Sequence, residues 1–131
     1  MTLAQSVITF ESSLSPEAAA DAILAAAPAE KFGVLADLDI HATLNSKGIA
    51  FEHPVRVIEV CSPPHAAEVL NNLLEISTAL PCRISVFRRD GKTWLSTIKP
   101  TIMLAMFECP QLADIAEEIE VSMVRIMQAA C

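Results

Sequence analysis

The most constraining feature of this sequence is the segment RISVFRRDGKTWLSTI, residues 83–98, in which two alternating runs are joined by an Asp-Gly pair. Apolar and polar side chains alternate in each run, as they do in a strand with one buried face. Asp90 and Gly91 accept the positive φ angles of a type I′ turn, a common connection in tight hairpins. The segment therefore predicts an antiparallel β-hairpin whose apolar face needs a cover.

Three further segments have strand character, and each is followed by a helix-start signal. Ser15 and Pro16 predict a helix that stops at Pro28, and Ser62 precedes a second helix that also begins with a proline. Asp39 is placed to cap a short helix over 40–47, which Gly48 can close in a left-handed conformation. The expected strands are residues 6–13, 32–38 and 53–61.

The C-terminal segment 110–130 is the longest amphipathic pattern in the chain, with apolar side chains at helical spacing. Such a helix needs an apolar surface to lie on, and the strands supply a sheet face. We therefore expect one α+β domain over residues 1–131, a sandwich in which helices pack mainly on one face of a largely antiparallel sheet. The apolar side of this helix is wider than one sheet contact requires, which favours an additional subunit interface.

The composition excludes several classes of partner. Hydrophobic residues make up 53% of the chain and the formal net charge is −7, so a globular protein without nucleic-acid affinity is expected. Charged residues interrupt every apolar run before the roughly 18 residues that a bilayer requires, so no membrane partner is expected. Glu11 and Glu17 near a start without positive charge argue against a secretory signal, which predicts a cytoplasmic location.

Cysteine and histidine form the best candidate site. Without an export signal, the four cysteines are expected to be reduced thiols. Cys61 directly precedes a helix start, where the helix dipole can lower the pKa of a thiol. His65 follows in the first turn of that helix, and Cys82 opens the next strand. If the two strands are neighbours, two sulfurs and an imidazole converge at one end of the sheet.

Several interpretations of these residues are open. Cys61, His65 and Cys82 suit a soft or borderline ion such as zinc or copper, yet free cysteine is also a common core residue. His41 could line a cleft near Asp39 and take part in ligand binding or proton transfer, or could simply be solvated. Asp37 and Asp39 could pair to bind a hard cation, although Asp39 is also expected to cap a helix.

Four stretches resemble a bacterial and archaeal family known as domain of unknown function 302. They are FGVLADLDIHATLNSKGI, RVIEVCSPPHAAEVL, ALPCRISVF and GKTWLSTIKP. The resemblance implies a TATA-binding-protein-like α+β arrangement and a homodimer. It implies no established activity and no catalytic residues.

Two hypotheses about function follow. In the first, the protein is a dimeric binding module that holds a small ligand or a soft metal near Cys61, His65 and Cys82. In the alternative, it is a thiol-dependent redox enzyme or sulfur carrier in which Cys61 is the nucleophile and Cys82 resolves it.

Overall fold

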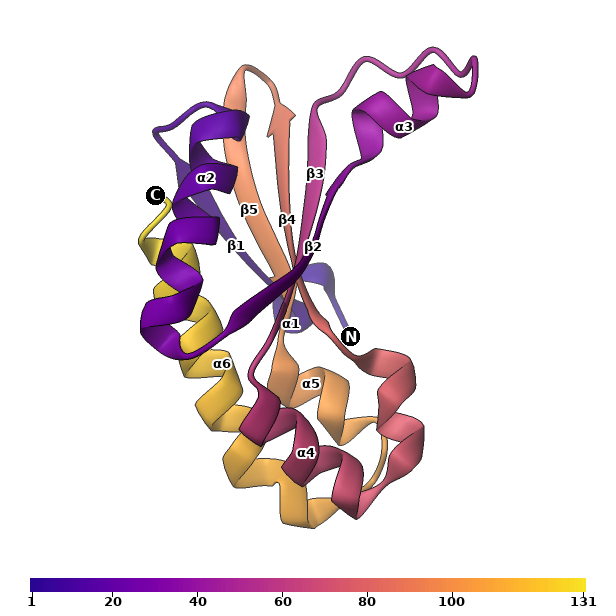
Figure 1. Ribbon diagram of the computed structural model, residues 1–131, viewed down its shortest axis with the longest axis vertical. Coiled ribbons are helices and arrows are strands. Elements are labelled where there is room, and N and C mark those ends of the chain that lie inside the picture. Colours follow the sequence, from indigo (N-terminus) through magenta and orange to yellow (C-terminus); the bar gives the residue numbers. More distant parts are fainter.

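The computed structural model describes all 131 residues and is built on a five-stranded sheet in which every pair of neighbours is antiparallel (Figure 1). The order across the sheet is β1-β5-β4-β3-β2, so β4 is the central strand. The strands are β1 (Val7–Ser12), β2 (Gly33–Asp39), β3 (Val55–Cys61), β4 (Cys82–Arg89) and β5 (Lys92–Ile98).

The predicted hairpin is confirmed as β4 and β5. Arg89 pairs with Lys92, and the two residues between them have φ angles of 53° at Asp90 and 74° at Gly91, as a type I′ turn requires. The alternation is also confirmed, because Ile84 and Leu95 are fully buried while their neighbours in sequence are more exposed. The hairpin therefore forms the centre of the sheet.

Two helices, α2 (Pro16–Ala26) and α6 (Ala113–Gln128), lie on one face of this sheet (Figure 1). Helix α2 contacts β3, β4 and β5, and α6 packs beside α2. The α2 start is as predicted, since the backbone N–H of Ala18 donates to Oγ of Ser15 at 3.1 Å. The α+β arrangement with an antiparallel sheet and helices on one face is thus confirmed. No helix combines the length and the apolar character needed to cross a bilayer.

A group of shorter helices gathers beyond one end of the sheet. Helix α4 (Pro63–Asn72) leaves β3, the 3₁₀ segment η2 (Leu74–Ala79) leads into β4, and α5 (Pro100–Ala105) leaves β5. Helix α5 was not among the sequence predictions, because its six residues are too few to show a helical period. Its one local signal is Pro100 at the first helical position.

The last helix starts later than its pattern indicated, because Pro110–Leu112 is a 3₁₀ turn, η3, and α6 begins at Ala113. Its wide apolar side is covered within the chain by α2, α4, α5 and the 3₁₀ turn η1 (Ala27–Glu30). These neighbours account for much of the apolar width of α6, and an additional subunit interface on this helix stays a prediction from sequence.

The expected strand over 32–38 is confirmed as the edge strand β2, and its pairing with β3 is irregular. The register shifts between Val34 and Ala36, which is typical of a β-bulge. Helix α3 (Ile40–Ser46) follows with the predicted cap, since the N–H of Ala42 donates to Oδ1 of Asp39 at 2.9 Å. Gly48 has the expected positive φ of 79°. We call residues 40–54 the arm, because this segment projects from the body of the molecule (Figure 1).

Candidate functional site

Cys61, His65 and Cys82 line one small cavity at the end of the sheet where β3 leaves and β4 enters. The antiparallel register places Cys82 opposite Val60, so the two cysteines occupy neighbouring positions on adjacent strands. Helix α4 starts two residues after Cys61 and brings His65 over the same space. The rest of the wall is mainly apolar and includes Phe32, Val69, Leu80, Met103 and Ile119.

Both thiols at this cavity are held in the neutral form. Burial raises the pKa of Cys82 to about 11, with a smaller contribution from the nearby Cys61, and Cys82 is only 8% exposed. Burial also raises the pKa of Cys61. The expectation that the helix start would lower the pKa of Cys61 is therefore wrong.

The sequence of the helix start explains this outcome. Helix α4 begins with Pro63 and Pro64, and a proline has no backbone N–H. Two of the donors that would stabilise a thiolate at a helix N-terminus are therefore missing, so desolvation of the sulfur is the larger effect. The side chain of Ser62 makes no capping hydrogen bond either.

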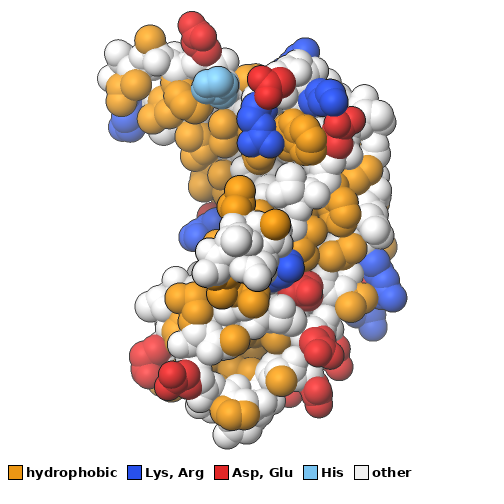
Figure 2. All heavy atoms as spheres, turned by 180° about the vertical axis from the view of Figure 1, so that it is seen from behind, with side chains coloured by type: hydrophobic (Ala, Val, Ile, Leu, Met, Phe, Trp, Pro, Cys, Tyr) orange, Lys and Arg blue, Asp and Glu red, His pale blue; other side chains and the backbone are white.

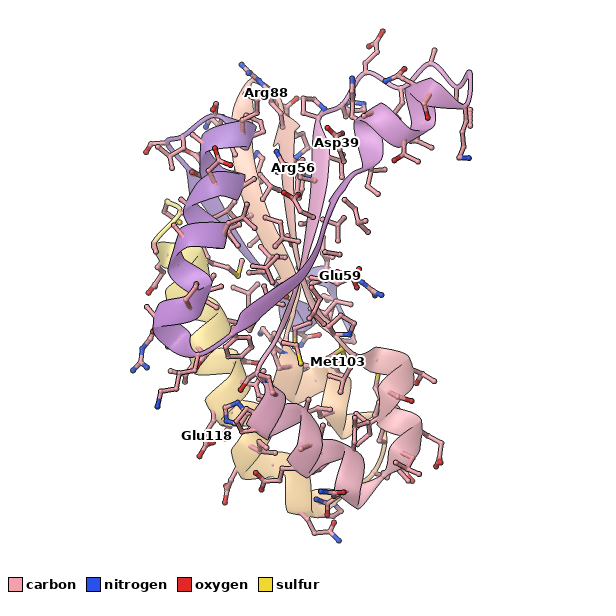
Figure 3. The ribbon with its side chains drawn as sticks, in the orientation of Figure 1. Asp39, Arg56, Glu59, Arg88, Met103 and Glu118 are labelled. Carbon is pink, nitrogen blue, oxygen red and sulfur yellow. The ribbon has the colours of Figure 1, made fainter.

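His65 is the most polar group in the cavity wall. Its Nε2 lies 3.2 Å from Oε2 of Glu118 on α6, which lies beside the start of α4 (Figure 3). Its Nδ1 is buried and has no hydrogen-bond partner. Buried polar atoms are nearly always paired, so an unpaired ring nitrogen beside a cavity indicates a place for a further group.

The cavity itself is narrow. The room inside for water-sized molecules is about 20 Å³, in the range of one or two such molecules. The wall has almost no polar surface, and its polar side chains are His65, Ser62 and the two neutral thiols. The arrangement suits a small uncharged group and offers no compensation for a buried charge.

The structure does not bring the predicted zinc or copper ligands into coordination geometry. No group of three or more His, Cys, Asp or Glu side chains is arranged to hold a metal ion. Cys61, His65 and Cys82 share a cavity without forming such a group. A metal at these residues stays a prediction from sequence.

The other two candidate residues, Asp39 and His41, lie at the opposite end of the sheet. They line a separate groove of about 350 Å³ together with Arg56 and Arg88 (Figure 3). Nδ1 of His41 lies 3.0 Å from the carbonyl oxygen of His53, inside the arm. The five candidate ligand-binding residues therefore lie at two places, one at each end of β3, and His41 and Asp39 share one groove.

The proposed carboxylate pair is not formed either. Asp37 accepts two hydrogen bonds from the guanidinium of Arg56, at 2.9 and 2.6 Å, and this ion pair raises the pKa of Arg56. Asp39 is occupied as the cap of α3. The two carboxylates therefore have separate structural roles, and a hard cation bound by both stays a prediction from sequence.

Three residues at or beside the cavity were not found by sequence reasoning. Glu118, which contacts His65 from outside the cavity, is one of several acidic residues on the polar side of α6, and nothing in its spacing distinguishes it from Glu117. Phe32 and Met103 line the cavity from the residue before β2 and from α5, whose places around α4 depend on the tertiary fold. No local signal could have joined these residues to His65.

Comparisons with known proteins agree on one family. The family model described as "Domain of unknown function DUF302" matches residues 8–130. The crystal structure of an uncharacterized conserved DUF302 protein from Bacillus stearothermophilus is similar with a TM-score of 0.91 and 30% sequence identity, over 95% of this chain and 98% of that chain. No match is found among curated proteins. The fold, the family model and this solved structure together show that the chain belongs to the DUF302 family.

Proposed function

We propose that this protein is a homodimeric binding module that takes a small uncharged ligand into the cavity lined by Cys61, His65 and Cys82. One observation supports the proposal above all: His65, which lines a narrow and mainly apolar cavity, has a buried ring nitrogen without a hydrogen-bond partner. Such a site gains from a ligand that fills the space and completes the missing hydrogen bond. The raised pKa values of both thiols make a reactive thiolate unfavourable, so binding is preferred over the thiol-enzyme alternative.

The cavity can be tested by filling it. Ala66 lines the cavity from α4, so Ala66→Leu places three additional carbon atoms in a space of about 20 Å³. We expect 1-propanol, titrated by ¹H–¹⁵N NMR, to perturb the signals around Cys61 and His65 with a dissociation constant on the order of millimolar. Ala66→Leu should abolish these perturbations.

The neighbouring residue supplies the control. Ala67 is exposed on the same helix and does not line the cavity, so Ala67→Leu should bind 1-propanol as the unmodified protein does. Perturbations that persist in Ala66→Leu, or that lie away from the cavity, would show that the ligand site is elsewhere.

The dimer part of the proposal is supported by β2 and the arm. β2 is an edge strand with no buried residue, and α3 in the arm has none either. Leu35 is 63% exposed, and Leu38 and Ile49 are also exposed. The arm and the hollow beside it carry hydrophobic side chains (Figure 2). An open strand edge can pair antiparallel with the same strand of a second copy about a two-fold axis, which would cover these side chains.

A charged side chain on the exposed edge of β2 should weaken the proposed dimer. Leu35→Glu would place a carboxylate next to its symmetry-related copy, so we expect at least a tenfold weaker self-association by sedimentation equilibrium. Leu74→Glu is the matched control, because Leu74 is 71% exposed but lies in η2, in the group of short helices beyond one end of the sheet. A dimer that dissociates only in the Leu74→Glu variant would place the interface there instead.

A further inference from the structure

His65 is shared by two spaces of different character. On one side is the apolar cavity, and on the other is an open groove of about 720 Å³ that is also lined by Glu118. The groove is rich in carboxylates and includes Glu30, Asp114 and Glu117. The side chain of His65 is 26% exposed and that of Glu118 is 67% exposed, so the ring forms the boundary between the cavity and the solvated groove.

The contact with Glu118 determines which hydrogen bond the other ring nitrogen can make. An ionised carboxylate only accepts hydrogen bonds, so in the pair with Glu118 the proton must be on Nε2 of His65. In a neutral imidazole the second nitrogen then has a free lone pair and no proton. The buried Nδ1 is therefore a hydrogen-bond acceptor that lacks a donor.

We propose that the cavity is selective for a small alcohol or thiol whose O–H or S–H donates to Nδ1 of His65, and that Glu118 sets this preference by keeping the proton on Nε2. The inference rests on the proposed function of the cavity and adds the class of ligand. Glu118 does not line the cavity, so it acts as a positioning residue through the ring.

The chemistry of the remaining wall supports an uncharged donor. Cys61 and Cys82 are neutral thiols, and a thiol is a weak acceptor that cannot compete with an imidazole nitrogen for the ligand's proton. No cation lines the cavity to pair with an anionic ligand, and no carboxylate lines it to pair with an ammonium group. The volume of about 20 Å³ restricts the buried part of the ligand to a few heavy atoms.

Two probes of the same shape test the inference. 1-Propanol carries a donor and 1-chloropropane does not, and both are titrated by NMR at pH 8 into the full chain. We expect the ratio of the two affinities to favour 1-propanol about 2- to 10-fold more in the unmodified protein than in His65→Phe, the range of one net hydrogen bond. His65→Phe keeps a planar ring without nitrogens, so the hydroxyl of 1-propanol is buried there without a partner and the variant should favour 1-chloropropane.

The role of Glu118 has an independent readout in the free protein. ¹⁵N NMR of the imidazole distinguishes a protonated from an unprotonated ring nitrogen, and we expect Nε2 of His65 to be protonated. Glu118→Ala should populate the other tautomer and reduce the preference for 1-propanol. Glu117→Ala, in the same groove but without a contact to His65, should change neither.

The outcomes separate this inference from the proposed function. A ratio of the two affinities that is the same in His65→Phe and in the unmodified protein, or a proton on Nδ1 in the unmodified protein, would overturn the donor selectivity while the cavity remains a binding site. Binding of neither probe would overturn the proposed function and the inference with it.

Discussion

Replacing Ile84 with alanine is expected to lower the free energy of unfolding by about 2–5 kcal/mol, the usual cost of removing three buried carbon atoms from a packed core. Ile84 is fully buried on the central strand β4, on the side that faces the helices. The layer between sheet and helices cannot collapse easily around such a deletion, because neighbouring side chains on β3 and β5 are also fully buried. Urea denaturation followed by circular dichroism measures the change.

Ile98 on the adjacent strand is the control for Ile84. It is 55% exposed near the end of β5, so Ile98→Ala should cost less than about 1 kcal/mol. Similar losses for the two variants would mean that the side of the hairpin that faces the core has been assigned wrongly.

Cys82 should make the stability of the protein fall with pH between about 9 and 11. Its pKa is about 11 in the folded protein and 9.0 in an unperturbed thiol, so folding favours the protonated form. Below pH 9 the Cys82 thiol is protonated in the folded and in the unfolded protein, and its contribution to the free energy of unfolding is fully present. As the pH rises through the folded pKa the contribution is lost, at about 1.4 kcal/mol per pKa unit, or about 2–3 kcal/mol in total.

The measurement for Cys82 compares unfolding free energies of the unmodified protein and Cys82→Ala at pH 8, 9, 10 and 11. Lysines and the other thiols titrate in the same range in both proteins, so the difference between the two proteins isolates Cys82. This difference should shrink by about 2–3 kcal/mol toward pH 11. Cys109→Ala, which removes a thiol outside the cavity, should show no comparable trend. A constant difference for Cys82→Ala would mean that the sulfur is not held in a desolvated site.

Part of the arrangement of the candidate site could be predicted from local sequence signals, and part depended on where the fold places distant segments. The nearness of Cys61 and Cys82 followed from sequence only on the condition that their two strands are neighbours, and the pairing of β3 with β4 meets that condition. His65 followed from its place in the first turn of α4. Asp39 and His41 share a separate groove at the other end of β3, and the sequence alone did not say how far that groove would lie from the cysteines.

The protonation state of the thiols and the hydrogen bonding of His65 could not be predicted from sequence. The helix-start argument about Cys61 considered the dipole of α4 but not the burial of the sulfur, and burial depends on Leu80, Met103 and the other residues that close the cavity. The hydrogen bond from His65 to Glu118 joins residues 53 positions apart. Interactions of this kind have no local sequence pattern.

The sequence by itself determined the elements whose signals are local: the turn at Asp90 and Gly91, the caps at Ser15 and Asp39, and the amphipathic period of α6. Each of these depends on backbone angles or hydrogen bonds within a few residues. Only the tertiary structure decided the sheet order, the exposure of β2, the neutral state of the two thiols and the pairing of His65 with Glu118. Desolvation and long-range contacts are properties of the assembled chain, because they depend on which distant side chains exclude water from a given atom.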